Sequence, residues 1–336
     1  MAELLVLTAP ELDDHETSYG HPEHRGRLDA ALAGIDEAGL GEATEWRLPE
    51  LASVDELGTV HDPTYVAGVE RFCAAGGGHL DADTIASPGS WITARRSAGA
   101  VLGGIEALRA GDCDVAFAAG RPPGHHAVRS GAMGFCLFNN AAVGAARLTA
   151  AGERVAIVDW DVHHGNGTQD IFYDDPNVLY VSTHQSPLYP GTGMLHETGT
   201  GAGIGNTLNL PFPEGAAGDT YRAAFDDVIV PVVERFRPDW LIISAGFDAH
   251  RDDPLAGIAL TADDYADLAI RLQSLVPARR LLVVLEGGYD LEALTRSVGT
   301  TLSALIGTSY RPEGVSSGTI GMSAVSAAKQ LWCQEP

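Results

Sequence analysis

Acidic and imidazole side chains gather directly after apolar segments of this 336-residue chain. The central group is Asp159, Asp161 and His163, which follows the β-branched run 155–158. Such a run without Pro or Gly predicts a strand buried on both faces, and at strand spacing the three polar side chains point the same way. Carboxylate oxygens and an imidazole nitrogen so placed could form half of a zinc site. A cap for the following helix is the commoner explanation of an isolated Asp-x-His, so the other clusters decide between them.

Two further clusters follow predicted strands. Residues 114–120 lead into the sequence RPPGHH, in which His126 could act as a general base and His125 could hold or tune it. An exposed His-His pair without function fits this loop equally well. The strand 240–244 leads to GFDAH, where Asp248 could complete the ligands begun by Asp161 and His163. Three ligands with one open position are typical of catalytic rather than structural zinc.

A fourth cluster, EGGY at 286–289, ends the strand predicted at 280–285. Its glycines allow a tight turn, and the Tyr289 hydroxyl could donate to a developing oxyanion, although a surface turn explains the same letters. Apolar strands alternate with helical segments along the chain without a compositional break. This alternation predicts a single doubly wound, mostly parallel α/β domain, with its site beyond the carboxyl ends of the strands. A Gly/Ser-rich linker is expected at 309–321 and a helix near 322–333.

Composition excludes several classes of protein. The formal net charge is −24 and Lys329 is the single lysine, which argues against nucleic acid as a partner. The chain has no Walker-type phosphate loop and no credible Schiff-base lysine. Four cysteines without CxxC spacing suit a reducing compartment, and no apolar run approaches the roughly 18 residues of a membrane span. We therefore expect a cytoplasmic protein without a membrane partner.

The four motifs in this order, RPPGHH, DWDVHHGNGTQ, GFDAH and EGGY, strongly resemble those of the zinc-dependent histone deacetylase superfamily. The resemblance is greatest to its class II branch, which includes bacterial histone deacetylase-like amidohydrolases and acetylpolyamine amidohydrolases. It covers roughly residues 1–308, the expected catalytic domain, and leaves 309–336 as linker and tail. It implies the arginase/deacetylase fold, an eight-stranded parallel sheet between helices.

The resemblance also implies roles for individual residues. Asp161, His163 and Asp248 match the ligands of one Zn²⁺, and Tyr289 matches the oxyanion donor. His126 matches the general base and acid, and His125 matches its electrostatic partner, hydrogen-bonded to Asp159. Potassium sites are implied at two sets of residues: an inner set of Asp159, Asp161, His163, Ser182 and Thr183, and an outer set of Phe172, Asp175 and Val178. The implied substrate contacts are Gly134, Phe135, Tyr189, Leu255 and Asp83, with Arg27 beneath the pocket, where it could help acetate leave.

Departures from the family pattern bear on substrate and basicity. Asn166 stands where many members carry an acid, which predicts a weaker base at His126, although Asn is usual in class II. Tyr189 replaces a phenylalanine and favours a more polar channel. Leu255 stands where acetylpolyamine specialists carry Glu, so polyamine specificity is less supported, although Asp13, Asp14 and Glu16 near the rim could attract a cation. Asn166 and His250 occupy places where dimanganese arginases need acids, so one catalytic metal is expected.

The activity implied is hydrolysis of the amide of an N-acylated amine such as acetyl-lysine. One alternative is an acetylpolyamine or another small acyl-amide or ester as substrate. An alternative of another class is an inactive reader of acetylated ligands, against which Tyr289 argues because the silent branch tends to lack it. Zinc or ferrous iron as the metal, the physiological substrate and the oligomeric state, including a homo-oligomer, are left open by the sequence.

Overall fold

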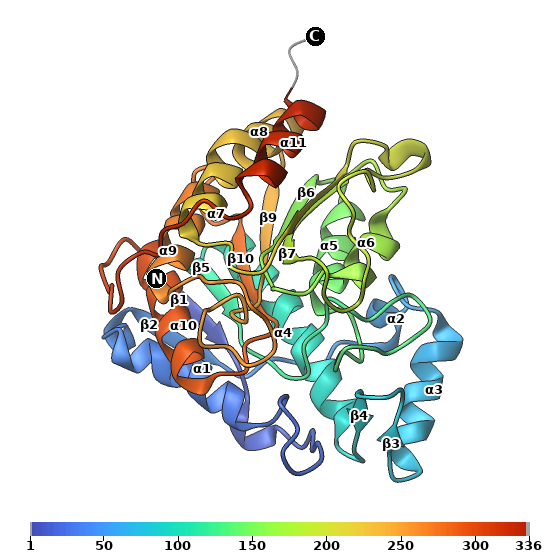
Figure 1. The fold of residues 1–336 in the computed structure, drawn as a ribbon. Coiled ribbons are helices and arrows are strands. Elements are labelled where there is room, and N and C mark those ends of the chain that lie inside the picture. The colour runs from blue at the N-terminus through green and yellow to red at the C-terminus, as the bar shows by residue number, and fades with distance from the viewer. Residues whose placement is uncertain (1, 334–336) are drawn as a thin grey trace.

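A single eight-stranded sheet, parallel throughout, forms the centre of the computed structural model, which describes residues 2–333 (Figure 1). Each strand is a short apolar run, and the central ones are buried on both faces, as expected for strands covered by helices on either side. Across the sheet the strands follow the order β2 (Thr44–Arg47), β1 (Ala2–Leu7), β5 (Cys113–Ala118), β10 (Leu281–Leu285), β9 (Trp240–Ala245), β6 (Val155–Asp159), β7 (Val178–Gln185) and β8 (Thr207–Phe212). The predicted fold is confirmed.

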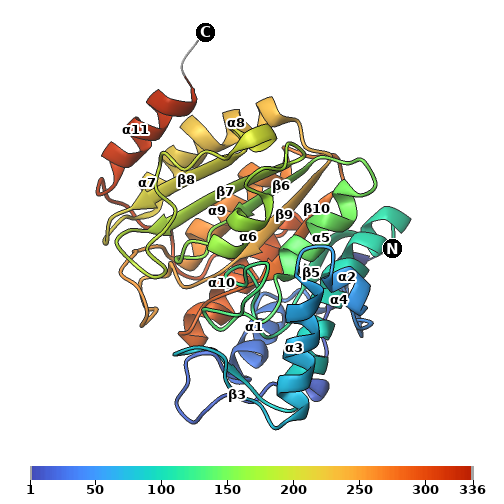
Figure 2. The same ribbon diagram turned by 90° about the vertical axis from the view of Figure 1, so that its right-hand side faces the viewer.

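Helices cover both faces of the sheet (Figure 2). One face carries α1 (Gly26–Glu37), α7 (Gly218–Ala224), α8 (Val230–Phe236), α9 (Ala262–Gln273), α10 (Leu291–Leu305) and α11 (Met322–Trp332). The other carries α3 (Pro63–Ala74), α4 (Ser90–Ala110) and α5 (Asn140–Thr149), with α2 (Val54–Leu57) and α6 (Asn166–Phe172) beside them. Alternate residues of β6 enter the two cores, Val158 on one side and Ile157 on the other, as the strand period requires.

The register of the three central strands determines where the polar residues meet. Asp159, the last residue of β6, lies opposite Ser244 of β9 and Ser182 of β7. Because the strands are parallel, their carboxyl ends lie at one edge of the sheet. The loops after β5, β6, β9 and β10, which carry the four sequence motifs, therefore leave the sheet at the same edge.

Some elements differ from the sequence-based expectation. The apolar pattern of residues 54–76 predicts one helix, but the structure has two, because the chain turns after Gly58 and α3 begins at Pro63 with Asp62 as its N-cap. The amphipathic pattern of residues 220–236 predicts a continuous helix, and the structure has there a π-helical turn, Phe225–Ile229, followed by a proline. Helix α9, strand β2 and the small antiparallel pair of β3 (Gly78–His79) and β4 (Ile85–Ala86) were not predicted. Helix α9 is acidic in its first turn, where Thr261 and Asp264 form a capping box.

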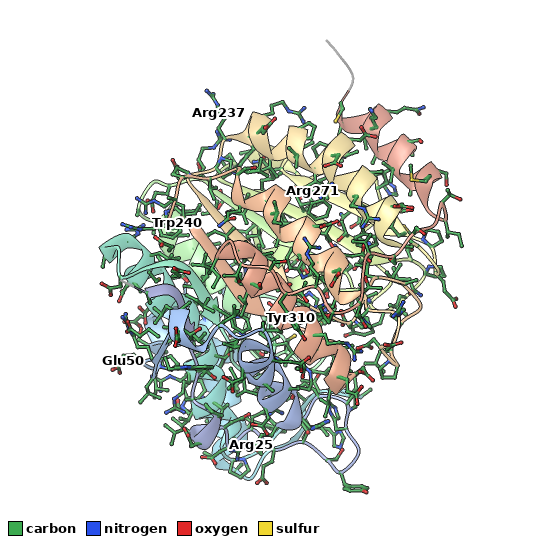
Figure 3. All side chains as sticks on the ribbon, turned by 90° about the vertical axis from the view of Figure 1, so that its left-hand side faces the viewer. Arg25, Glu50, Arg237, Trp240, Arg271 and Tyr310 are labelled. Carbon is green, nitrogen blue, oxygen red and sulfur yellow. The ribbon has the colours of Figure 1, made fainter. Side chains whose placement is uncertain are left out.

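Residues 309–333, expected as linker and tail, contact the rest of the chain at several points. Tyr310 donates its hydroxyl proton to Glu37 of α1, on the face of the molecule shown in Figure 3. The carboxylate of Asp264 accepts hydrogen bonds from the amide and hydroxyl of Ser316. Helix α11, which the sequence predicted, buries Val325, Ala328 and Trp332 against α7 and β8. The domain boundary at 308 stays a prediction, but the residues beyond it contribute to the core.

Candidate active site and metal centre

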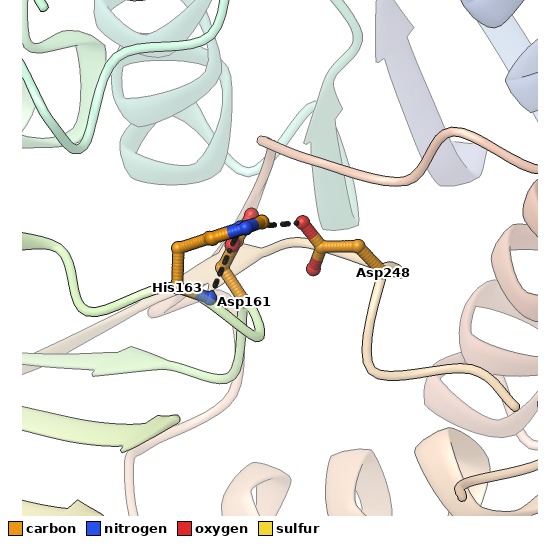
Figure 4. Close-up of side chains that lie close together, drawn as sticks. All are labelled: Asp161, His163 and Asp248. Atoms are coloured by element: carbon orange, nitrogen blue, oxygen red, sulfur yellow. Dashed lines mark hydrogen bonds and ion pairs between the residues drawn. The ribbon is translucent and has the colours of Figure 1, made fainter. Parts of the chain in front are cut away.

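Asp161, His163 and Asp248 converge at the carboxyl edge of the sheet (Figure 4). Their potential ligand atoms all lie within 4.8 Å of one another. The Nδ1 atom of His163 is 3.2 Å from Asp161 Oδ1 and 3.1 Å from Asp248 Oδ2. Asp248 is distant from Asp161 and His163 along the chain. The three side chains meet because β6 and β9 are neighbours in the sheet. The structure thus brings together the three side chains that the sequence proposed as one ligand set.

Two glycines make room for these carboxylates. A Cβ atom on Gly246 would lie 2.0 Å from Asp161 Oδ2, and a Cβ atom on Gly287 would lie 2.2 Å from Asp248 Oδ2. The amide of Gly287 also donates to Asp161 Oδ2 at 2.8 Å, and the amide of Val162 donates to Asp248 Oδ1 at 2.8 Å. Any larger residue at either glycine would displace a carboxylate, so the backbone itself shapes the site.

The charges at this site fit a divalent cation. Burial and the neighbouring Asp161 raise the pKa of Asp248 to about 7 in the metal-free chain. Burial opposes the charging of His163, yet hydrogen bonds to the two carboxylates raise its pKa to about 10. Among residues 2–333, the ion pairs of Asp161 and Asp248 are with histidines alone. Two buried acids and one imidazole without a lysine or arginine are a donor set that suits Zn²⁺.

The adjacent histidines His125 and His126 have opposite electrostatic surroundings. Although burial opposes its charge, the carboxylates of Asp161 and Asp159 raise the pKa of His125 well above its usual value, and its Nδ1 lies 3.0 Å from Asp159 Oδ2. Burial and the nearby charge of His125 hold the pKa of His126 well below its usual value. The two ring centroids are 4.0 Å apart. At neutral pH His126 is therefore a neutral imidazole beside a charged one.

Asn166 fixes the orientation and the tautomer of His126. The Nδ1 atom of His126 is 2.8 Å from Asn166 Oδ1, while Asn166 Nδ2 points to the sulfur of Met133, a weak acceptor. The amide oxygen can only accept, so the proton of the neutral ring is on Nδ1 and Nε2 keeps its lone pair. A ring in this tautomer can take a proton at Nε2.

Glu286 is a part of the site to which the sequence analysis gave no role. Its buried carboxylate accepts hydrogen bonds from the amides of Gly124 and His125, at 2.7 Å and 3.1 Å, and from the hydroxyl of Ser244 at 2.9 Å. Burial raises the pKa of Glu286 to about 7. This carboxylate fixes the turn that carries the two histidines. Its place at the head of EGGY was visible in the sequence, but its partners, far away along the chain, were not.

A pocket of about 240 Å³ opens above the ligand set. It is lined by Asp83, His126, Gly134, Phe135, His163, Leu188, Tyr189, Leu255 and Tyr289. All five predicted substrate contacts are among these residues, and Leu188 is the one wall residue that the sequence analysis did not single out. The Tyr189 ring centroid lies 5.1 Å from that of His126, and the Phe135 centroid lies 5.8 Å from that of Tyr289. The pocket is a short aromatic channel with Asp83 in its lining.

Tyr289 is held from below by Arg27. The Arg27 guanidinium carbon lies 4.8 Å from the tyrosine ring centroid, and burial, only partly offset by this charge, raises the pKa of Tyr289 well above its usual value. The Tyr289 hydroxyl therefore keeps its proton at neutral pH. Arg27 is fully buried and also pairs with Glu23. Arg27 thus contacts a residue of the pocket lining, and its expected role in acetate release stays a prediction.

The acids expected at the rim divide into two groups. Asp14 and Glu16 are exposed and line a groove that Tyr289 also borders. Asp13 is buried, because its carboxylate pairs with Arg121 of the RPPGHH motif at 2.6 Å. Asp13 is thus neutralised within the chain, and the expectation that it could attract a cationic substrate does not fit its position.

The residues assigned to potassium lie in two groups. Asp159 and Ser182 are register partners on β6 and β7, and the hydroxyl oxygen of Thr183 is buried without a hydrogen-bond partner in the described structure. Phe172, at the end of α6, accepts a hydrogen bond from the amide of Asp175, and Val178 begins β7 shortly afterwards. The members of each set are neighbours along the chain or across the β6–β7 pair, and because side chains alternate along a strand, the Thr183 hydroxyl faces the opposite side of the sheet from Ser182.

The model of the histone deacetylase domain matches residues 21–305, most of the chain and all four motif loops. The chain belongs to the histone deacetylase family. It is 43% identical over 284 residues to a probable deacetylase of Archaeoglobus fulgidus, with 83% of this chain and 79% of that protein covered. It is 40% identical over 275 residues to a histone deacetylase-like amidohydrolase of Pseudomonas aeruginosa, with 80% of this chain and 72% of that protein covered.

The fold of this histone deacetylase domain matches that of a solved relative. The crystal structure of the HDA15 HD domain superposes with a TM-score of 0.91 at 36% sequence identity, covering 98% of this chain and 94% of that one. The predicted family, the arginase/deacetylase fold and an enzyme of the deacetylase and amidohydrolase type are thereby confirmed. Within residues 2–333, no helix combines the length and apolarity that crossing a bilayer requires.

Proposed function

We propose that this chain hydrolyses the amide bond of an N-acylated amine such as acetyl-lysine, with one zinc ion as cofactor. The observation that carries the proposal is the convergence of Asp161, His163 and Asp248 beneath a pocket that is also lined by His126 and Tyr289. A metal-ligand set, a neutral base and a protonated hydroxyl at one cavity are the parts that hydrolysis of an amide requires.

Asp161, His163 and Asp248 would hold the zinc ion. When bound, zinc supplies a Lewis acid that polarises a carbonyl group and lowers the pKa of water to roughly 7. The buried carboxylates, free of lysine and arginine partners in residues 2–333, support this assignment. We propose one metal rather than two, because Asn166 and His250 stand where a second ion would need acids.

The side chains of the protein move the protons. His126, neutral and with a free Nε2, accepts a proton from the attacking water and passes it to the leaving amine. His125, charged and hydrogen-bonded to Asp159, is the electrostatic partner whose charge keeps the ring of His126 neutral. Tyr289 keeps its proton and donates a hydrogen bond to the carbonyl oxygen, where negative charge develops. We propose that Arg27, behind Tyr289, helps the acid product to leave.

The pocket supports an acylated amine as substrate. Phe135 and Tyr189 can flank an aliphatic chain, and Leu255 gives an apolar wall where an acidic gatekeeper would favour polyamines. Asp83, in the pocket lining, can accept a hydrogen bond from the substrate beyond the acyl group. Potassium at the sets around Asp159 and Phe172 would have a structural role.

The proposal is tested by turnover of the zinc-loaded protein on acetyl-lysine peptides, acetylpolyamines, longer acyl-lysines and small esters, with and without a hydroxamate. We expect release of the acid from acetyl-lysine that the hydroxamate inhibits. Preference for acetylpolyamines or esters would keep the hydrolase and change the substrate. Bound zinc without turnover of any of these compounds would contradict the proposal and favour an inactive reader of acetylated ligands.

The free thiols of Cys73, Cys113, Cys136 and Cys333 support a further proposal, that the chain works in a reducing, cytoplasmic compartment. Fractionation of the cells that make it tests this location. A homo-oligomer also stays a proposal, which the mass of the purified protein in solution tests.

A further inference from the structure

The peptide bond between Gly288 and Tyr289 is held at both of its polar atoms by buried charged groups. Arg27 donates from Nε to the carbonyl oxygen of Gly288 at 2.6 Å. On the amide side, Asp253 Oδ2 accepts the N–H of Tyr289 at 2.7 Å and the N–H of Asp290 at 3.3 Å. A guanidinium on one side and a carboxylate on the other fix the plane of this peptide, and with it the direction in which the tyrosine side chain leaves the backbone.

The sequence explains why this peptide needs such support. Gly287 and Gly288 precede Tyr289, and Gly288 has a φ of 118°. Gly287 has to be a glycine because any Cβ atom there would collide with Asp248. Two successive glycines give the backbone more freedom than any other pair of residues, so local propensity does not determine where Tyr289 lies. Its position must come from groups elsewhere in the chain.

Asp253 joins the tyrosine to a second residue that lines the pocket, Leu255. Its other oxygen, Oδ1, accepts the N–H of Leu255 at 3.0 Å. Leu255 and Tyr289 both line the pocket, whereas Asp253 does not. Asp253 is only 5% exposed and forms no salt bridge within residues 2–333. Its side-chain hydrogen bonds are with backbone N–H groups, so one carboxylate links two residues that line the pocket.

We infer that Asp253 is a positioning residue, which holds the hydroxyl of Tyr289 at the reacting carbonyl and keeps Leu255 at a set distance from it. The inference rests on the proposed hydrolysis and adds a residue to it. Without Asp253 the Gly288–Tyr289 peptide keeps only the Arg27 contact and can rotate. The hydroxyl then occupies a range of positions, and turnover falls although the metal ligands are unchanged.

The test is a double-mutant cycle between Asp253→Ala and Tyr289→Phe on the zinc-loaded protein. Misplacement of a catalytic group by about 1 Å costs up to ~100-fold, so we expect Asp253→Ala to lower kcat by ~30- to 100-fold with KM changed less than ~3-fold. In the Tyr289→Phe background the same substitution should cost less than ~3-fold, because the group it positions is already absent. Asp252→Asn is the control, because the carboxylate of Asp252 is exposed and pairs with Arg296 rather than with the amide of Tyr289 or Asp290. This variant should keep the kcat of the wild type.

The outcomes separate the role of Asp253 from that of the proposed function. Equal losses in both backgrounds would show a merely structural effect and overturn the inference, while hydrolysis itself stands. No turnover by the wild-type protein on any acyl-amine would overturn the proposed function and this inference with it. If Asp253→Ala does not fold, Asp253→Asn takes its place in the double-mutant cycle. This substitution keeps the shape of the side chain and replaces one acceptor oxygen by a donor. Zinc content close to that of the wild type in every variant shows that the loss does not arise at the metal.

Discussion

The neutral ring of His126 donates its Nδ1 proton to the side-chain oxygen of Asn166 across 2.8 Å. This hydrogen bond leaves Nε2 free to accept a proton at the pocket. The hydrogen bond to Asn166 raises the pKa of His126, but the amide brings no charge, and the burial of the ring and the charge of His125 still hold that pKa low. Asn166 thus orients the base and strengthens it less than a carboxylate would.

Asn166→Asp should make His126 a stronger base. A carboxylate at this distance favours the imidazolium and raises the pKa by roughly one unit or more. Because the ring must be neutral to accept a proton, the acid limb of the kcat/KM profile should move to higher pH. The pH–rate profile measures it, with Asn177→Asp at an exposed position as the control. An unshifted profile would mean that another group limits the reaction at low pH.

Zinc binding should release protons. In the metal-free chain the pKa of His163 is about 10 and that of Asp248 about 7, so at pH 7 the site holds at least one proton that the metal must displace. Affinity for zinc should therefore rise with pH, about tenfold per unit for each proton released. Calorimetric titration in two buffers of different ionisation enthalpy counts the protons. A titration without proton release would exclude this ligand set.

Tyr289→Phe should lower kcat by about 100- to 1,000-fold, the usual cost of removing one oxyanion donor. The high pKa of the tyrosine keeps the donor protonated over the working range of pH, so the loss should not depend on pH between 6 and 9. Steady-state kinetics measure the loss, and elemental analysis should find zinc retained. Tyr310→Phe, whose hydroxyl binds Glu37 far from the pocket, is the matched control. Retained activity in Tyr289→Phe would remove the tyrosine from the mechanism.

Gly287→Ala should abolish metal binding in a protein that is still folded. The new methyl group would lie 2.2 Å from Asp248 Oδ2 and 2.5 Å from Asp161 Oδ2, and both carboxylates would have to move. We expect zinc affinity to fall by at least ~100-fold, beyond the usual effect of a change in the groups around the ligands. Gly68→Ala in α3, where a Cβ meets no atom within 4 Å, should bind zinc as the wild type does. Normal zinc content in Gly287→Ala would show that this glycine does not make room for the carboxylates of Asp161 and Asp248.

Helix α11 should stabilise the whole domain. Trp332 is 9% exposed in the main core, so Trp332→Ala should lower the free energy of unfolding by on the order of 3 kcal/mol. Leu331→Ala, at a side chain that is 51% exposed, should change it by less than about 0.5 kcal/mol. Denaturant unfolding measures both values. If a chain ending at residue 308 unfolds at the same denaturant concentration as the full chain, α11 contributes no stability.

The strands and the helices with clear apolar periodicity could be predicted from the sequence, because burial and the period of the backbone are local properties. The bounds of β6, β9 and β10 lie within about two residues of the expected ranges. Helix α9 could not be predicted in this way. Its first turn is acidic, so the apolar residues that it buries in the core do not stand out in the sequence. Residues 309–321 were expected as a linker because they have no apolar periodicity. Their hydrogen bonds to Asp263 and Asp264 are made by backbone and serine groups, which no sequence pattern reveals.

For the candidate site too, part could be predicted from the sequence and part could not. The sequence by itself determined which residues could bind metal and carry protons, since Asp161, His163, His126 and Tyr289 stand at the ends of recognisable strands. Only the tertiary structure decided that Glu286 supports the histidine turn and that Asp253 holds the tyrosine peptide. These contacts join residues far apart in the chain. They depend on the order of strands in the sheet and on loop geometry, which no local periodicity records.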